Sequence, residues 1–289
     1  MSEGYPFLKG HGTENDFVLL PDHDGTVHGD LDPARVARLC DRRAGIGGDG
    51  VLRVVRTEAY AAAREHADPA EAEWFMDYRN SDGSLSEMCG NGVRVFARHL
   101  LEEGLVEPGR PIPVGTRAGV KVIEVDGDRI TVDMGRPQVL GTTEVAVGSA
   151  RWAAAHVDMG NPHAVAFLDE GQSLAVDGPV GPLASEPDFD RSVYPHGVNV
   201  EFVERRGAGH VAMRVHERGS GETRSCGTGA CAVAVAAAVA DGRAAGGPGA
   251  DATYRVDLPG GTLEITWTAD DRVLMSGPAV VVARGTTAL

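Results

Sequence analysis

The stretch Glu217–Gly242, ERGSGETRSCGTGACAVAVAAAVADG, places a cysteine between a polar, glycine-rich turn and an apolar run. The run from Thr228 to Ala240 predicts a helix that is apolar on every side, which is typical of a helix enclosed by protein. Cys226 then lies at the helix N-terminus, where unpaired backbone N–H groups and the helix dipole favour an anion such as a thiolate. Such a position can lower a cysteine pKa from about 8.5 towards roughly 3.5–7.5. The stretch therefore indicates a thiol that exchanges protons near neutral pH.

The same arrangement occurs a second time around Cys89. MCGNGVRVFARHLLEEG (88–104) aligns with SCGTGACAVAVAAAVADG (225–242), and in both segments CGxG begins the helical run and glycine ends it. A period-two strand pattern and a polar glycine turn precede each cysteine, with Asn80 opposite Glu217. Two copies of strand, turn, cysteine and buried helix predict two similar lobes. A pseudo-twofold relation between them would bring both helix N-termini to one anion site.

Six motifs resemble the diaminopimelate epimerase family, from Phe7 to about Val282. In the family's order they are HGTENDF (11–17), GIGGDG (45–50), RNSDGSLSEMCGNGVR (79–94), DMGNPHAV (158–165), GVNVEFVE (197–204) and ERGSGETRSCGTGACA (217–232). Members are cofactor-independent isomerases that interconvert LL- and meso-2,6-diaminopimelate in lysine and peptidoglycan precursor biosynthesis. The resemblance implies an α/β protein of two pseudo-symmetric lobes. Each would be a strand-rich sheet wrapped around a central buried helix, with the active site in the cleft between the lobes.

The lobes are expected to divide near Arg117. Residues 1–117 would form the first lobe and residues 118–274 the second. The resemblance implies that a C-terminal strand, about 275–289, returns to the first lobe. Residues 57–73, rich in Ala, Glu and Asp, interrupt two strands and are expected to form a part-helical surface excursion without a catalytic role.

Cys89 and Cys226 are the candidate catalytic residues. Inverting a Cα centre needs a base on one face and an acid on the other, and two apposed thiols supply both. One would begin as thiolate and the other as thiol. The substrate carboxylate would lie at the two helix N-termini, where backbone N–H groups stabilise developing enediolate charge. The residues expected to offer those groups are Gly90, Asn91, Gly227 and Thr228.

Further binding residues around the distal amino acid centre follow from the resemblance. They are Asn15, Asn80, Asn161, Asn199, Glu217 and Arg218. Arg218 suits a planar carboxylate because a guanidinium donates two parallel hydrogen bonds. His163 alone would more often be a structural residue, but the resemblance makes His163 and Glu217 candidate helpers in proton transfer.

This chain departs from the family's usual pattern at two positions. Glu14 stands where the family usually has Gly, so the turn before Asn15 is expected to differ locally. Gly50 stands where members often carry a Gln that approaches the substrate pocket, so that contact is absent here. The other two cysteines, Cys40 and Cys231, are expected to be small buried core residues rather than catalysts.

Composition limits the partners and the cofactors. The net charge of −15 is spread without a basic block, which argues against nucleic acid and anionic membrane as partners. The start, MSEGYPFLKG, has no signal-peptide pattern, and the apolar run Ala230–Ala240 is too short to span a bilayer. We therefore expect a cytoplasmic protein acting on a small molecule, and the resemblance adds a homodimer.

No cofactor is expected. Lys9 and Lys121 are the only lysines, and both fall in strand-like segments unsuited to a pyridoxal phosphate Schiff base. No metal is expected either, because Cys89 and Cys226 lack Cys or His partners at ligand spacing such as CxxC.

Three alternatives remain at this stage. A proline or hydroxyproline racemase of the same fold would share CGTG and the two thiols, although HGTENDF, GNPH and ERGSGET argue against it. A zinc or redox-switch protein would use the same cysteines without catalysis. A non-catalytic binding relative is the third, and an isomerisation assay separates it from an enzyme.

Overall fold

The computed structural model describes residues 4–244, 247 and 249–289, and the chain divides into two compact units. The first unit comprises Met1–Val132 and Gly277–Leu289, and the second comprises Asp133–Ser276. Residue 117, the expected crossing point, lies between β5 (Ile112–Thr116) and β6 (Gly119–Asp126). These two strands pair as a hairpin inside the first unit.

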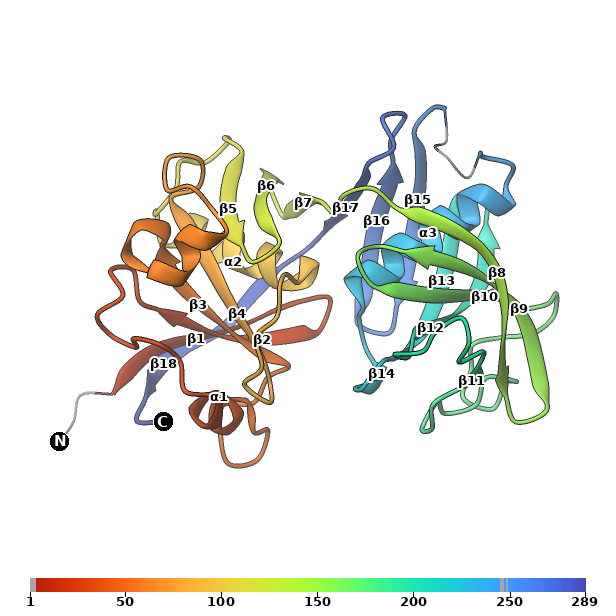
Figure 1. Cartoon of the computed structure of the whole chain (residues 1–289), viewed down its shortest axis with the longest axis horizontal. Helices are drawn as coiled ribbons and strands as arrows, with labels where there is room; N and C mark the ends of the chain where they lie inside the picture. Colours follow the sequence, from red (N-terminus) through yellow and green to blue (C-terminus); the bar gives the residue numbers. More distant parts are fainter. Residues whose placement is uncertain (1–3, 245–246, 248) are drawn as a thin grey trace. The chain divides into compact units, whose positions relative to one another are not determined.

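In the first unit, strands surround the helix α2 (Gly90–Glu102), as Figure 1 shows. Along the sheet the order is β18 (Val280–Thr287), β1 (Tyr5–Gly12), β2 (Asn15–Pro21), β3 (Gly50–Arg56), β4 (Trp74–Asn80), β5, β6 and β7 (Arg129–Asp133). A shorter helix, α1 (Pro33–Cys40), begins after Asp32, whose carboxylate accepts a hydrogen bond from Ala34 N at 3.1 Å. An aspartate N-cap followed by a first-turn proline, Pro33, is a typical helix start.

In the second unit, strands surround the helix α3 (Gly227–Ala240) (Figure 1). The order is β8 (Gln138–Val147), β9 (Ala150–Asp158), β10 (Pro162–Phe167), β12 (Asn199–Gly207), β13 (His210–Glu217), β15 (Ala252–Leu258), β16 (Gly261–Trp267) and β17 (Val273–Gly277). Two short strands, β11 (Asp188–Phe189) and β14 (Gly221–Thr223), pair with β8 and β13.

The two units repeat one topology. In the first unit, β2 and β3 pair parallel, β4 and β5 pair parallel, and the other neighbours pair antiparallel. The second unit has the same succession, with β10/β12 and β13/β15 as its parallel pairs. Each helix follows the equivalent strand, β4 or β13. The predicted α/β fold of two similar strand-rich units, each around one buried helix, is therefore confirmed.

The helices are enclosed as their sequences predict. Every residue of α3 from Gly229 to Ala238 is buried, and the apolar face of α2 is buried as well. The inserted segment begins with the 3₁₀ turns η1 (Thr57–Ala59) and η2 (Ala61–Glu65), and its Tyr60 packs near Phe75 of β4. No helix formed by the described residues is both long and apolar enough to cross a membrane.

The C-terminal strand differs from the prediction. The sequence predicts one strand over about 275–289, but the structure has β17 ending at Gly277 and β18 starting at Val280. Pro278 stands between them, and proline has no backbone N–H to continue a ladder. The break lets β17 complete the second unit and β18 pair with β1 in the first.

Candidate active site

Both candidate cysteines cap a helix through sulfur. Cys89 is the N-cap of α2, and its Sγ accepts a hydrogen bond from Gly92 N at 3.4 Å. Cys226 is the N-cap of α3, and its Sγ accepts a hydrogen bond from Gly229 N at 3.3 Å. The predicted repeat of cysteine and helix is thus confirmed, and the two copies share the same hydrogen bond from a backbone N–H to the cysteine sulfur. Each sulfur faces the positive end of a helix dipole, which favours a thiolate.

The pKa of Cys226, however, moves opposite to the sequence prediction. Burial of its thiol, only 6% exposed, raises the pKa well above the ordinary value, and the carboxylates of Glu217 and Glu201 raise it further. The N–H of Gly229 and the hydroxyl of Thr228, 3.6 Å from Sγ, act in the other direction but are outweighed. Desolvation of a charged group outweighs the helix terminus here. Burial and the two carboxylates therefore favour the protonated form of Cys226, which suits a group that donates a proton.

Around Cys89, Asn15 is held from both ends. Its Oδ1 accepts hydrogen bonds from Asn91 Nδ2 at 3.2 Å and from the Cys89 thiol at 3.6 Å. Its Nδ2 donates to Asp49 Oδ2 at 2.7 Å. Arg94, buried in α2, donates from Nη2 to Asn91 Oδ1 at 2.6 Å. Asn15 and Asn91 are therefore brought to Cys89, and Asp49 and Arg94, which the sequence did not single out, fix their amides.

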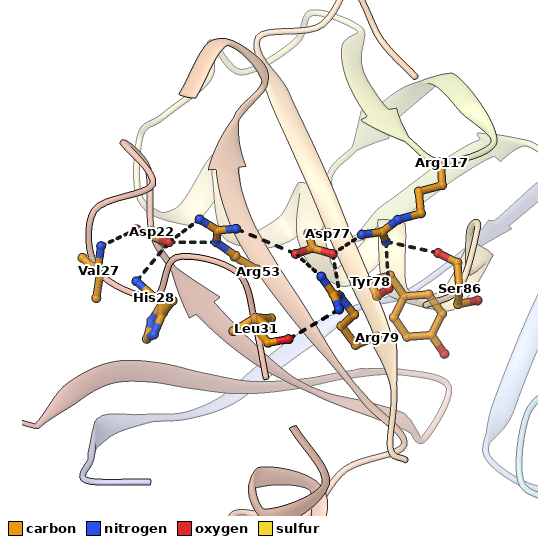
Figure 2. Close-up of polar contacts among 10 residues, drawn as sticks. All are labelled: Asp22, Val27, His28, Leu31, Arg53, Asp77, Tyr78, Arg79, Ser86 and Arg117. Atoms are coloured by element: carbon orange, nitrogen blue, oxygen red, sulfur yellow. Dashed lines mark hydrogen bonds and ion pairs between the residues drawn. The ribbon is translucent and has the colours of Figure 1, made fainter. Parts of the chain in front are cut away.

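The turn that precedes Cys89 rests on a buried charge network, shown in Figure 2. Asp77 is fully buried and contacts the guanidinium groups of Arg53, Arg79 and Arg117. Arg117 also donates from Nη1 to the carbonyl oxygens of Tyr78 at 3.0 Å and Ser86 at 3.4 Å (Figure 2). The network thus ties β4 to the segment that leads into the helix cap.

Asn80 shapes the other end of that turn. Its Nδ2 donates to Ser84 Oγ at 3.0 Å, and its backbone N–H donates to the Ser84 carbonyl at 2.9 Å. Asn80 ends β4, the strand equivalent to β13, which ends at Glu217. The alignment of Asn80 with Glu217 in the sequence therefore corresponds to equivalent places in the two units.

In the second unit, Asn199 joins two of the predicted segments. Its Nδ2 donates to the Pro162 carbonyl at 3.2 Å, and its Oδ1 accepts from Arg218 N at 3.0 Å. The turn at 160–163, the start of β12 and the end of β13 therefore meet at one amide. The Arg218 side chain is exposed, and its Nη1 donates to the His196 carbonyl at 3.3 Å.

Glu217 lies close to the same place. Its carboxylate accepts a hydrogen bond from the Thr223 hydroxyl, across the β13–β14 hairpin. Its charge contributes to the raised pKa of Cys226. A carboxylate beside a thiol opposes formation of the thiolate.

His163 and Glu201 form a buried pair. His163 Nδ1 lies 2.6 Å from Glu201 Oε1, and both side chains are fully buried. His163 Nε2 lies 3.1 Å from Asn161 Oδ1, so two predicted residues contact each other. Burial raises the pKa of Glu201, and His163 lowers it in part. Glu201 is not among the residues expected from the sequence, although a glutamate inside the apolar strand GVNVEFVE is a signal.

The two departures at Glu14 and Gly50 have local consequences. Thr13 and Glu14 adopt φ values of 50° and 62°, in the left-handed region where glycine carries no steric cost. A Cβ on Gly50 would lie 2.5 Å from the Arg79 carbonyl oxygen and 2.7 Å from the Tyr78 ring. This backbone therefore excludes the glutamine that the family often has at that position.

The remaining two cysteines are core residues, as predicted. Cys40 packs with Val36 and Leu39 on the buried face of α1, and burial raises its pKa to about 11. Cys231 is fully buried inside α3.

Comparison with known proteins gives one family. The model of the family described as diaminopimelate epimerase matches residues 7–140 and 155–282. A diaminopimelate epimerase from Streptomyces coelicolor is 58% identical, over 99% of this chain and 96% of that protein. Another, from Thermobifida fusca, is 49% identical, over 96% of each chain.

Solved structures with low identity share the fold. A Bacillus anthracis phenazine biosynthesis protein of the PhzF family has a TM-score of 0.67 and 15% identity, covering 99% of this chain and 100% of that one. A hydroxyproline epimerase from Agrobacterium vitis, with bound trans-4-hydroxy-L-proline, has a TM-score of 0.61 and 18% identity, covering 100% and 93%. At these identities the likeness concerns the fold alone.

Proposed function

This chain belongs to the diaminopimelate epimerase family, and we propose that it interconverts LL- and meso-2,6-diaminopimelate through two cysteines, Cys89 and Cys226. The observation that carries the proposal is the repeated cap: in each unit a cysteine sulfur lies at the N-terminus of a buried helix. The reaction belongs to lysine and peptidoglycan precursor biosynthesis. The proposal includes no cofactor.

The mechanism follows from what inversion at Cα requires. One sulfur removes the Cα proton as a thiolate, and the other delivers a proton to the opposite face of the carbanion as a thiol. Because the reverse reaction exchanges the roles, each turnover leaves the two sulfurs in swapped protonation states. Cys226, whose pKa is raised by burial and by nearby carboxylates, is the proton donor in the resting state that we propose.

The charge that develops on the substrate carboxylate needs stabilisation. We assign this role to the first-turn N–H groups of Gly90 and Asn91 in α2 and of Gly227 and Thr228 in α3. The backbone N–H groups of a first helical turn and the helix dipole favour an anion. Such preorganised donors take the place of the electron sink that a cofactor would provide.

The distal amino acid centre of the substrate carries its own ammonium and carboxylate. The proposed binding residues are Asn15, Asn80, Asn161, Asn199, Glu217 and Arg218. Support comes from their local order: Asn15 and Asn199 are each fixed by hydrogen bonds on both sides of the amide. Arg218 is the proposed partner of the distal carboxylate, Glu217 is an acidic partner for an ammonium group, and His163 assists proton transfer.

The racemase alternative has weaker support. The hydroxyproline epimerase shares the fold at 18% identity, whereas relatives named diaminopimelate epimerase share 58% and 49% identity over nearly the whole chain. The segments HGTENDF, GNPH and ERGSGET, which argue against a proline substrate, all contribute residues to the local networks described above.

We also propose a cytoplasmic homodimer. A reducing compartment suits a mechanism that needs one thiolate and one thiol. For the dimer, β18 offers an interaction surface, since it exposes Val280 and Val282 by 45% and 55%. Light scattering on the Val282→Glu variant, with Val176→Glu as a control at another exposed valine, tests this surface. An unchanged dimer mass in Val282→Glu would exclude it.

The activity itself is tested by solvent exchange. LL-diaminopimelate incubated with the protein in deuterated water should gain deuterium at one Cα while the meso isomer accumulates. Chelator dialysis and omission of pyridoxal phosphate should leave the rate unchanged. Absence of exchange with the folded, reduced protein would refute the proposed function.

A further inference from the structure

The first turns of α2 and α3 pack against different kinds of side chain. In the first unit, a Cβ placed on Gly92 of α2 would lie 3.4 Å from Leu52 Cδ2 and 3.5 Å from the Phe17 ring. In the second unit, a Cβ placed on Gly229 of α3 would lie 2.8 Å from Glu201 Oε1. The side chains packed against the first turn of α2 are thus apolar, whereas a carboxylate packs against the first turn of α3.

The strand register shows that these side chains occupy equivalent positions in the two units. Phe17 pairs with Gly50 in the parallel ladder of the first unit, and His163 pairs with Asn199 in that of the second. Leu52 lies two residues beyond Gly50, just as Glu201 lies two residues beyond Asn199. The pair Phe17 and Leu52 is therefore replaced in the second unit by His163 and Glu201. An ionisable pair at a fully buried place is costly, which points to a role beyond packing.

Glu201 is close enough to Cys226 to influence its proton. The Cβ position on Gly229 is 2.8 Å from Glu201 Oε1 and 3.2 Å from Cys226 Sγ. The carboxylate and the sulfur are therefore within about 6 Å of each other, a distance at which two negative charges disfavour one another strongly in a buried site. A glycine at position 229 permits this approach.

We propose that Glu201, fixed by His163, is a positioning residue that keeps Cys226 in its protonated state. When Nδ1 carries the proton, His163 donates to Oε1 at 2.6 Å and opposes the rise that burial causes in the Glu201 pKa, while the ionised carboxylate opposes loss of the thiol proton. The raised pKa of Cys226, to which Glu201 contributes, agrees with this role. The inference rests on the proposed function in one respect: it makes Cys226 the resting acid of the two-thiol reaction.

Other titratable groups face this place. Glu217 acts on Cys226 in the same direction as Glu201. Tyr194, whose buried hydroxyl has no hydrogen-bond partner among the described residues, has a pKa raised by burial and by Glu201. Burial and the Glu201 charge both keep Tyr194 protonated. Tyr194 is therefore neutral near pH 7 and adds no charge beside Glu201.

The test is a titration of the thiols in the full-length protein labelled with ¹³C at the cysteine Cβ. The chain has four cysteines, so four signals report thiol and thiolate directly, and Cys→Ser variants assign them. In Glu201→Gln, which keeps a hydrogen-bond acceptor for His163, we expect the Cys226 midpoint to fall by about one pH unit or more. Glu201→Asp, which keeps the charge, should stay near the wild type. Glu204→Gln, on the same strand, is the matched control.

A Cys226 midpoint that is unchanged in Glu201→Gln overturns the proposal. The proposal is also overturned if the Cys226 signal stays at the thiol position over the whole titration in both the wild type and Glu201→Gln. Cys226 would then stay protonated without the Glu201 carboxylate. If Glu201→Gln fails to fold, the double variant His163→Phe with Glu201→Leu installs the pair of the first unit and should lower the midpoint likewise. The titration needs no turnover, so a protein without epimerase activity would refute the proposed function without deciding this coupling.

Discussion

Cys89 and Cys226 occupy the same position in two copies of one fold, each accepting at sulfur a hydrogen bond from the backbone N–H three residues further along, at 3.4 and 3.3 Å. The copies differ in what surrounds the sulfur. Cys89 is partly exposed and its Sγ lies 3.6 Å from Asn15 Oδ1, whereas Cys226 is buried beside Glu201 and Glu217. A symmetric backbone thus carries two chemically unequal thiols, which is what a reaction with one acid and one base requires at its start.

Replacing either capping cysteine with alanine should abolish epimerisation. The loss is expected to be at least about 100-fold in kcat, because a general acid or base is removed outright. Cys40→Ala and Cys231→Ala are the matched controls, since both thiols are buried away from the helix caps. They should cost roughly 1–2 kcal/mol of stability and little activity. Equal catalytic losses in all four variants would mean that the active thiols are misassigned.

Asp49 should matter for catalysis although it is exposed. Its carboxylate accepts from Asn15 Nδ2 at 2.7 Å and so directs Asn15 Oδ1 towards Cys89. We expect Asp49→Ala to lower kcat/KM by about tenfold, because small displacements in a site have such effects. Asp24→Ala, at an exposed carboxylate that contacts Thr26, serves as the control. Identical steady-state kinetics for both variants would show that Asn15 does not need this support.

The buried charge network should dominate the stability of the first unit. Asp77→Ala leaves Arg53, Arg79 and Arg117 without their shared carboxylate (Figure 2). Removing one partner of a buried ion pair costs about 3–5 kcal/mol because a charge stays buried and uncompensated. Urea unfolding measures the loss, and Asp128→Ala, at a fully exposed carboxylate, should stay within about 0.5 kcal/mol of the wild type. A comparable small effect for Asp77→Ala would contradict the network's role.

Two buried histidines should make the protein sensitive to mild acid. Burial lowers the pKa of both His28 and His99 to about 4. The unfolded chain, with histidine pKa values near 6.5, therefore takes up protons before the folded one. The contribution of the two neutral histidines to the free energy of unfolding is fully present above about pH 6.5 and is lost as the pH falls towards 4. His99→Leu should remove roughly 2 kcal/mol of the difference in unfolding free energy between pH 7 and pH 4.5. Parallel pH profiles for variant and wild type would refute the assignment.

Much of the fold and of the site was predictable from local patterns. The apolar run of α3, the CGxG repeat and the cap at Asp32 are encoded within a few residues, and each corresponds to the observed element. Contacts that depend on strand register were not predictable. Glu201 meets His163 only because β10 and β12 pair in parallel, and Asp49 meets Asn15 only through the folded turn.

The protonation of Cys226 is the clearest case of that limit. A helix N-terminus is visible in sequence and predicts a lowered pKa, whereas the burial and the carboxylates that raise it arise from the assembled fold. The break at Pro278 is a similar case. A continuous apolar pattern predicts one strand. Only the pairing of β17 with β16 and of β18 with β1 shows that the segment forms two strands.

Substrate choice should depend on Arg218. Its side chain is exposed, its backbone N–H donates to Asn199 Oδ1, and its guanidinium donates to the His196 carbonyl, with no ion pair to it among the residues that the structure describes. Arg218→Lys should lower activity towards LL-diaminopimelate by at least about tenfold, because an ammonium cannot reproduce the two parallel hydrogen bonds to a carboxylate. Arg191→Lys, at an exposed pair with Glu186, is the control and should be neutral.

For the same reason, L-proline should be a poor substrate. Proline has no distal carboxylate for the proposed contact with Arg218 and no distal ammonium for the proposed contact with Glu217, and a site built to bind polar groups disfavours a ligand that lacks them. Deuterium exchange from solvent into L-proline and into LL-diaminopimelate, followed side by side, tests both halves with one method. Exchange should be confined to diaminopimelate and should fall in Arg218→Lys but not in Arg191→Lys. Comparable exchange into proline would refute the substrate assignment and leave the two-thiol chemistry standing, since that chemistry acts at Cα and is indifferent to what the distal end carries.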